Sequence, residues 1–133
     1  MALERRHTSK NLTIDVDTEK GYMYSNWIGF QKLDTVKPGA ERMLEILKKE
    51  KLTLVLNDNR NVTGPFQEAI KWLTDEWFPQ MFAAGMQKFA QLESPSVFAK
   101  HSANQAITGT NKKDEAICIF TDEEEGRKWL AVQ

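Results

Sequence analysis

Among its 133 residues the sequence has one cysteine and two histidines. The single cysteine, Cys118, cannot form a disulfide within the chain, and its position in the apolar segment AICIF is typical of a buried thiol in a reducing compartment. No group of cysteines and histidines has the spacing of a zinc site. The sequence therefore predicts neither a disulfide framework nor a metal site.

The chain also lacks an excess of charge and a membrane-spanning segment. Lysine and arginine number 18 against 19 for aspartate and glutamate, which gives a net charge of −1, whereas a general nucleic-acid binder needs a basic excess. No apolar run approaches the roughly 20 residues of a transmembrane helix, and no apolar stretch follows the two arginines of the N-terminal MALERRHTSK as it would in a signal peptide. We expect a cytoplasmic protein with no integral membrane segment and no nucleic-acid partner.

The residues that are present form strand and helix patterns of a single domain. Residues 1–10 are polar and predict a flexible N-terminal tail, whereas residues 11–133 fit one domain. Residues 12–16 alternate apolar and polar side chains, and the aromatic-rich segment 22–30 has the composition of a second strand. The short turn at Gly21 between them predicts an antiparallel hairpin.

Three further strand patterns alternate with helical ones. The apolar run 52–56 is typical of a strand buried on both faces, and weaker patterns at 86–93 and 115–120 predict two more. Helices are predicted to begin at residues suited to a cap or a first turn: Asp34 or Thr35, Pro65, Ser94 and Thr121.

The predicted fold class is α/β, with the order β-β-α-β-α-β-α-β-α. It corresponds to a mixed, mostly parallel five-stranded sheet with an N-terminal antiparallel hairpin. Right-handed crossovers between the parallel strands place the helices mainly on one face. The other face is then either poorly covered or covered by a second copy of the chain. A homodimer is therefore one candidate arrangement.

The stretch LTLVLNDNRNVTGP, residues 52–65, predicts a polar loop at the carboxyl end of a buried strand. Ligands usually bind at this edge in α/β proteins, and the positive end of the helix expected at Pro65 favours an anion or an acidic side chain of a partner. The alternative is a structural turn, in which Asp58 satisfies backbone groups and Arg60 forms an ion pair. The predicted ligand- or partner-binding loop comprises Asp58, Asn59, Arg60, Asn61 and Thr63.

Aromatic residues supply a second set of candidates. Trp77 lies on the apolar stripe of its predicted helix, whereas Trp72 lies about 120° away from it, where an exposed tryptophan is typical of an interface. Burial in the core is the alternative for both. The interface candidates are Trp72, Trp77 and Phe78 on the helix, and Tyr22 and Tyr24 on one strand face.

Three short motifs resemble those of a known family: Trp27-Ile28-Gly29-Phe30, Asp58-Asn59-Arg60 and Glu76-Trp77-Phe78-Pro79. With the order of elements, they make residues 11–132 resemble the SpoIIAA-like fold of STAS domains, which occurs in anti-anti-sigma factors and sulfate-transporter tails. The chain is more closely similar to the small bacterial STAS/SEC14-domain proteins. The related CRAL-TRIO/SEC14 domains bind lipids.

The resemblance implies a phosphorylation switch that this chain would have to build differently. In anti-anti-sigma factors a kinase phosphorylates a serine that follows an aspartate at the end of the central strand. Asp58 matches that aspartate, but Asn59 follows it and cannot be phosphorylated. Thr63 is the nearest hydroxyl and the candidate phosphosite, with a helix cap as its alternative role.

These observations favour a non-catalytic regulatory or protein-interaction domain of STAS-like type with an unknown protein partner. Asp58 and Arg60 would set specificity by charge, and Trp72 and Phe78 would supply apolar contact area. The alternative is a small-molecule carrier that binds a lipid or an anionic metabolite, as the SEC14 resemblance implies. An enzyme is not expected, because the sequence shows no nucleophile–base pair or metal set, and no cofactor is predicted.

Overall fold

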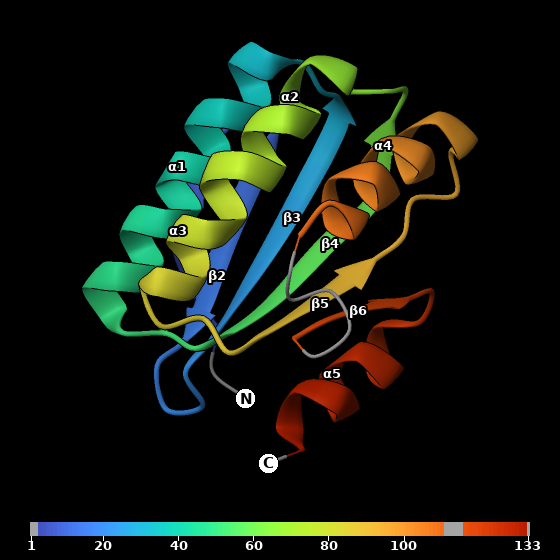
Figure 1. Ribbon diagram of the computed structural model, residues 1–133. Coiled ribbons are helices and arrows are strands. Elements are labelled where there is room, and N and C mark those ends of the chain that lie inside the picture. Colours follow the sequence, from blue (N-terminus) through green and yellow to red (C-terminus); the bar gives the residue numbers. More distant parts are fainter. Residues whose placement is uncertain (1–2, 111–115, 133) are drawn as a thin grey trace.

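The computed structural model describes residues 3–110 and 116–132. The protein is built on a six-stranded mixed sheet whose strands lie in the order of the sequence (Figure 1). The strands are β1 (Glu4–Thr8), β2 (Leu12–Asp17), β3 (Tyr22–Phe30), β4 (Leu54–Thr63), β5 (Lys88–Leu92) and β6 (Ile117–Phe120). The helices are α1 (Leu33–Glu50), α2 (Gln67–Trp72), the π-helix η1 (Leu73–Trp77), α3 (Phe78–Ala83), α4 (Val97–Thr108) and α5 (Glu123–Ala131). β1 to β3 pair antiparallel, and β3 to β6 pair in parallel.

The general α/β class and the antiparallel hairpin are confirmed, but the predicted count of five strands is wrong. The sixth strand is β1, which lies within the segment predicted as a flexible tail and pairs with β2. Its residues are exposed or half-buried, so the apolar alternation that signals a strand is missing. Ion pairs hold it instead, because Arg5 binds Asp15 of β2 and Arg6 donates to both carboxylate oxygens of Glu50 at 2.7 and 3.0 Å.

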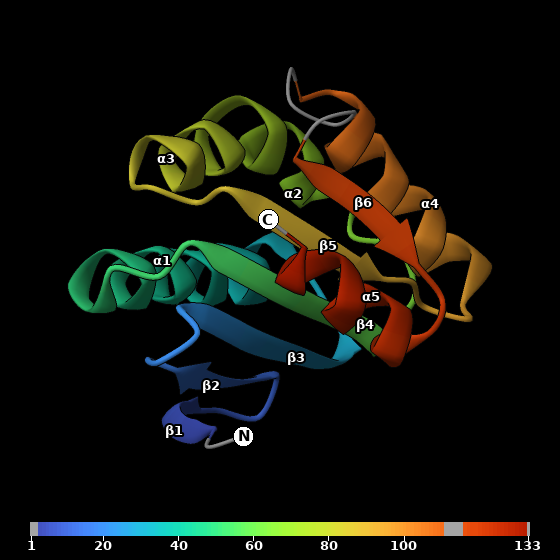
Figure 2. The same ribbon diagram turned by 90° about the horizontal axis from the view of Figure 1, so that it is seen from below.

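The helical connections between the parallel strands cover one face of the sheet. Each returns the chain to the next strand in the same direction, and right-handed crossovers place α1, the continuous α2–η1–α3 segment and α4 on one side. α5 follows the last strand, makes no crossover and packs on the opposite face, where it lies across β4 and β5 (Figure 2). The predicted one-sided arrangement therefore describes α1 to α4 and not α5.

Alternate residues of the central strands fill the two cores. Met23, Val55 and Phe89 are fully buried beneath the helix layer, whereas Leu56 and Leu92 are buried beneath α5. Burial of each such side chain contributes roughly 1.5–3 kcal/mol. The apolar run at the start of β4 is therefore explained by a strand that is covered on both faces.

β4 continues through the segment that was predicted to be a loop. β3 runs beside it as far as the pair Phe30↔Thr63, so Asp58 to Thr63 belong to a strand and not to a loop. The prediction was wrong because these polar side chains are buried or bonded on the sheet, and a search for apolar residues does not detect such a strand.

The ladder between β3 and β4 contains a bulge. From the pair Asn26↔Asp58 to the pair Ile28↔Asn61, β4 advances by three residues and β3 by two. One additional residue, at Asn59 or Arg60, therefore lies in β4. Bulges re-aim the side chains that follow them, and they are frequent next to functional sites.

Three predicted helix caps are displaced along the chain. The N-cap of α1 is Lys32 rather than Asp34 or Thr35, because Thr35 lies in the first turn and accepts from the Lys32 backbone N–H. Ser94 Oγ donates to Val62 O at 2.7 Å, and Ser96 caps α4 instead by accepting from Ala99 N. Asp122, rather than Thr121, caps α5. The second crossover begins its α2 segment at Gln67, two residues after Pro65.

Two glycines allow the helices to approach the sheet closely. A Cβ atom on Gly39 of α1 would lie 2.6 Å from Cη2 of Trp27, closer than real Cβ contacts. A Cβ on Gly126 of α5 would lie 3.3 Å from Cδ1 of Leu56. The space beside the glycine is therefore tighter at Gly39 of α1 than at Gly126 of α5.

Candidate functional site

The polar residues at the end of β4 point to opposite faces of the sheet and form two separate clusters. Asp58 and Arg60 join Tyr24 on the face that α5 covers. Asn57 and Asn59 face the helix layer, where Asn57 donates to both Asn59 and Gln91 of β5. The structure therefore separates residues that the sequence analysis placed in a single binding loop.

In the charged cluster on the α5 face, both carboxylate oxygens of Asp58 are hydrogen-bonded. Asp58 is 1% exposed and accepts from the Tyr24 hydroxyl at 2.6 Å, from Arg60 Nε and Nη2 at 3.0 and 2.7 Å, and from the Arg60 backbone N–H at 2.9 Å. Arg60 Nη2 also donates to Glu123 of α5 at 2.8 Å. Glu123 in turn binds Arg127, whose guanidinium lies over the Tyr24 ring, 5.7 Å from its centroid.

These contacts shift the protonation equilibria of the cluster. Burial raises the pKa of the Asp58 carboxyl, but hydrogen bonds from Arg60 and Tyr24 outweigh burial and hold that pKa below its usual value. Burial and the neighbouring Asp58 carboxylate raise the pKa of the Tyr24 hydroxyl. The hydrogen bond to Asp58 raises the pKa of Arg60. Asp58 is therefore an anion, and Tyr24 a neutral donor, at neutral pH.

The arrangement supports the structural alternative for Asp58 and Arg60. Their charges are directed at each other and at Glu123, so the cluster joins β4 to α5. Because the positive groups are already paired, the cluster offers little to an incoming anion.

Asn61 and Thr63 of the predicted loop are exposed, whereas Asn59 is buried. Asn61 donates to the Asn26 side chain at 3.3 Å across the ladder. Thr63 ends β4 and does not cap the next helix, so its predicted capping role is wrong. The backbone N–H of Phe66, the residue before α2, donates to Ser102 Oγ of α4 at 3.1 Å instead. The phosphosite at Thr63 stays a prediction.

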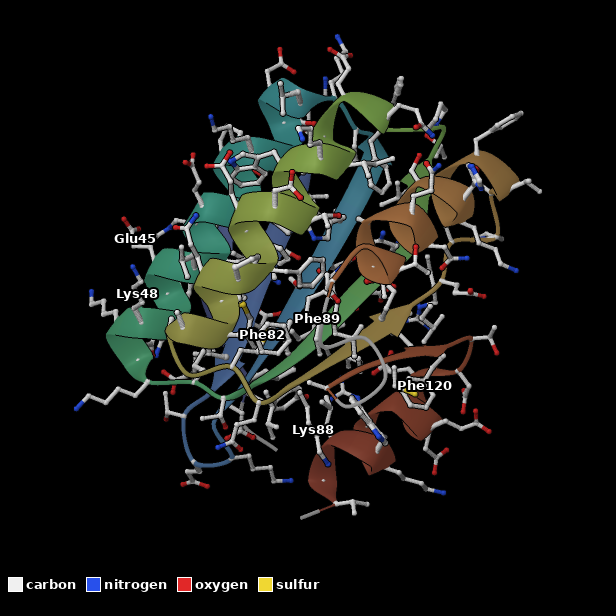
Figure 3. All side chains as sticks on the ribbon, viewed as in Figure 1. Glu45, Lys48, Phe82, Lys88, Phe89 and Phe120 are labelled. Carbon is white, nitrogen blue, oxygen red and sulfur yellow. The ribbon has the colours of Figure 1, made fainter. Side chains whose placement is uncertain are left out.

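Most of the aromatic interface candidates belong to the core. Trp77 and Phe78 are 4% and 3% exposed, and with Phe89 they form three edge-to-face ring contacts with centroids 4.9 to 6.0 Å apart. Figure 3 shows Phe89 beneath the helix layer. Tyr22 is buried beneath α5. The prediction that Trp77, Phe78 and Tyr22 lie at an interface was wrong. The sequence does not show that helices cover the aromatic side chains on both faces of the sheet, because this depends on tertiary packing.

Two of the candidates remain partly accessible. Trp72 is half-buried against the core, and the Lys37 ammonium lies 5.8 Å from its ring centroid. Tyr24 is half-buried, with its hydroxyl committed to Asp58. Neither side chain projects freely from the surface.

A chain of amide side chains lies under the helix layer. Asn57 Oδ1 accepts from Trp27 Nε1 at 2.9 Å and from Ser25 Oγ at 2.7 Å. Asn57 Nδ2 donates to Gln91 Oε1 at 2.9 Å and to Asn59 Oδ1 at 3.3 Å. Gln91 is 2% exposed, and its Nε2 has no acceptor among the residues that the structure describes.

A cavity of about 60 Å³ adjoins these amides. Its polar lining comes from the sheet and from Gln31 in the connection between β3 and α1, and its apolar lining comes largely from the helices. Both Leu73 and Trp77, the first and last residues of the π-helix η1, line it. The sequence analysis missed this site. The available signal was the alternation of Asn57 and Asn59, which continues the period of the apolar run before them.

A third feature is the exposed apolar surface at the carboxyl edge of the sheet. Phe30 at the end of β3 is 50% exposed, and Val97 and Phe98 at the start of α4 are 74% and 67% exposed. Thr63 is paired with Phe30, and Ser94, which lies shortly before α4, donates to Val62 O near the end of β4. The sequence analysis predicted a binding loop at this edge, on Asp58 to Thr63, and did not single out these apolar residues.

Across residues 3–110 and 116–132, no three histidine, cysteine, aspartate or glutamate side chains are grouped so that they could hold a metal ion. No helix in the described part of the chain is long and apolar enough to cross a membrane. Comparisons with protein-family models, with curated proteins and with solved structures give no match.

Proposed function

We propose that the chain is a non-catalytic protein-interaction domain of STAS-like type that binds its partner at the carboxyl edge of the sheet. The observation that carries the proposal is the exposure of Phe30, Val97 and Phe98 along this edge. Large apolar side chains left in water gain most from a partner that covers them, and aromatic residues dominate the binding energy of many interfaces. The partner is a protein with an apolar contact surface.

The position of Thr63 supports a charge-based control of this contact. Thr63 is exposed beside Phe30, and Gly64 follows it with a φ of +73°. A phosphate on Thr63 would place about two negative charges next to the apolar contact, where burial of charge is unfavourable. Phosphorylation there would release the partner, and Thr63→Glu would weaken binding in the same direction.

Purification of the full chain from its own host tests the proposal. Partner recovery would be compared between the native chain, the double variant Phe30→Ser/Phe98→Ser and the control Val132→Ser, because Val132 is 63% exposed and lies in neither of these edge segments. We expect the same partner, identified by mass spectrometry, with the native chain and the control, and at least a tenfold loss with the double variant. Equal recovery from all three would refute the proposal. A mass of two chains that the double variant reduces to one would identify the partner as a second copy.

The carrier alternative finds less support. The cavity of about 60 Å³ is well below the roughly 150 Å³ that encloses a benzene molecule, so a lipid chain does not fit in it. None of the described residues that line it is charged, so it offers no countercharge to an anionic metabolite.

A further inference from the structure

The orientation of the amide chain is fixed from one end. An indole N–H can only donate, so Trp27 Nε1 requires that the oxygen of Asn57 faces it. The Asn57 nitrogen then faces Gln91, whose oxygen must accept from it. The remaining polar group of the Gln91 side chain is the Nε2 donor, which is buried and has no acceptor among the described residues. An unpaired buried donor costs about 1–3 kcal/mol, so it calls for an explanation.

The same logic assigns a second donor. Asn59 Oδ1 accepts from Asn57 Nδ2, which leaves Asn59 Nδ2 as the group that it can offer. Both Asn59 and Gln91 line the cavity. The sheet wall of the cavity therefore presents amide donors and calls for an acceptor.

The opposite wall of the cavity is apolar. Leu73, Trp77 and Phe78 approach from the helix layer, and Ala103 and Ile107 approach from α4. An occupant therefore has an oxygen acceptor at one end and an apolar body at the other. Because no described lining residue is charged, the occupant is neutral.

The helix over the cavity is irregular at the same place. Phe78 N–H bonds Leu73 O, five residues earlier, and the residues at the two ends of this π-turn both line the cavity. Single π-turns within helices are rare and occur frequently at functional sites. This backbone irregularity is independent of the unpaired donor, and both features point to the same cavity.

We propose that this cavity is a binding site for a small neutral molecule that carries a carbonyl oxygen. The oxygen accepts from Gln91 Nε2, with Asn59 Nδ2 as the second donor on that wall, and the apolar part packs against Trp77 and the α4 side chains. Phe30, Val97 and Phe98 of the carboxyl-edge surface do not line this cavity, so the site adds a ligand to the proposed interaction function and does not depend on it.

Three small probes of the same shape test the recognition: acetone, isobutene, which replaces the oxygen with a CH₂ group, and acetate. Binding to the full chain would be followed through the NMR signals of the Gln91 side-chain amide and the Trp27 and Trp77 indole N–H groups. Acetone should move the Gln91 amide protons to lower field, and isobutene should leave them in place while shifting the indole signals. Acetate should bind more weakly than acetone.

The variant Gln91→Met removes the donor and keeps an unbranched side chain. The ratio of acetone affinity to isobutene affinity should fall about five- to tenfold, which is the worth of one hydrogen bond between neutral groups. Differences in the hydration of the probes cancel, because the same two probes are compared in both proteins. Gln105→Met, the same substitution on the exposed surface of α4, should leave the ratio unchanged.

An unchanged ratio in Gln91→Met would overturn the proposal, as would acetate binding as tightly as acetone. Absence of binding by every probe would also overturn it and would leave a cavity that holds water alone. If Gln91→Met fails to fold, the response of the native Gln91 amide to acetone and isobutene decides the question.

Discussion

Neighbouring residues of β4 point to opposite faces of the sheet, and their polar groups differ in charge and in how completely they are bonded. Asp58 and Arg60, on the α5 face, are charged, and every oxygen of the carboxylate has a donor. Asn57 and Gln91, under the helix layer, are neutral, and one N–H is left over beside a cavity. A saturated charged cluster stabilises one arrangement of the chain, whereas a leftover neutral donor is a group through which a ligand can bind.

The largest expected effect comes from breaking the charged cluster. Asp58→Ala removes four hydrogen bonds, which leaves the Tyr24 hydroxyl without this acceptor and the Arg60 side chain with Glu123 alone. Removal of one member of a buried pair typically costs about 3–5 kcal/mol, and we expect the lower end because the Arg60 side chain is 40% exposed and can be hydrated. Urea unfolding measures the change. The control Asp75→Ala, which breaks an exposed pair with Lys71, should alter stability little, and an equal loss in both variants would contradict this account of the cluster.

Packing on the two faces can be compared by the same substitution at two glycines. Gly39→Ala places a methyl group 2.6 Å from the Trp27 ring and should destabilise the protein by about 1–3 kcal/mol, although alanine favours a helix. Gly126→Ala meets Leu56 at 3.3 Å, and its helix preference of about 1 kcal/mol should offset the contact. Thermal unfolding of the two variants would show whether Gly39→Ala is the less stable, and the reverse order would refute the packing difference.

The pH dependence of stability should distinguish the charged face from the neutral one. The pKa of Asp58 is lower in the folded chain than the value of about 3.9 in an unfolded chain, so its stabilising contribution is present above about pH 4 and is lost as the pH falls through the folded pKa. The gap in unfolding free energy between the native chain and Asp58→Asn should therefore narrow between pH 5 and pH 3. The exposed substitution Asp75→Asn is the control, and a gap that stays constant would show that Asp58 gains nothing from ionisation.

The smallest effect is expected under the helix layer. Gln91→Met removes an unpaired donor, which favours the variant, and removes the acceptor of Asn57 Nδ2, which disfavours it. Because Asn57 keeps its contact with Asn59, the two effects should nearly cancel, to within about 1 kcal/mol. Chemical denaturation measures this change, and a loss as large as that of Asp58→Ala would mean that the amide chain supports the fold rather than a ligand.

The sequence predicted those elements whose apolar side chains repeat with a regular period. The hairpin of β2 and β3, the start of β4 and the helices of the first two crossovers are of this kind, whereas α4 was predicted from the residues at its start. β1 was missed because ion pairs rather than apolar burial hold it, and the end of β4 was missed because its buried side chains are polar. Local patterns describe what a segment can bury, and these two segments depend on partners far away in the chain.

The candidate sites show the same limit. Trp27, Asn57 and Gln91 belong to three strands, and only the register of the sheet brings them together. Asp58 was identified from its place at the end of a strand, but its partners Tyr24 and Glu123 are not apparent from spacing. Exposure of Phe30 and Phe98 depends on which surfaces the helices leave uncovered, and a single sequence does not reveal that.

The bulge in β4 has a consequence for how the length of this strand can vary. Asn59 and Val62 both line the cavity although three positions separate them, because one residue between them is additional to the ladder. Deletion of Arg60 would restore strict alternation along β4 and would keep all the remaining side chains of the strand on their present faces. Asp58 would lose its ion pair. A deletion at Leu56 would instead turn the residues that follow it to the wrong face. Natural insertions and deletions in relatives of this protein should therefore collect at this single point of the strand.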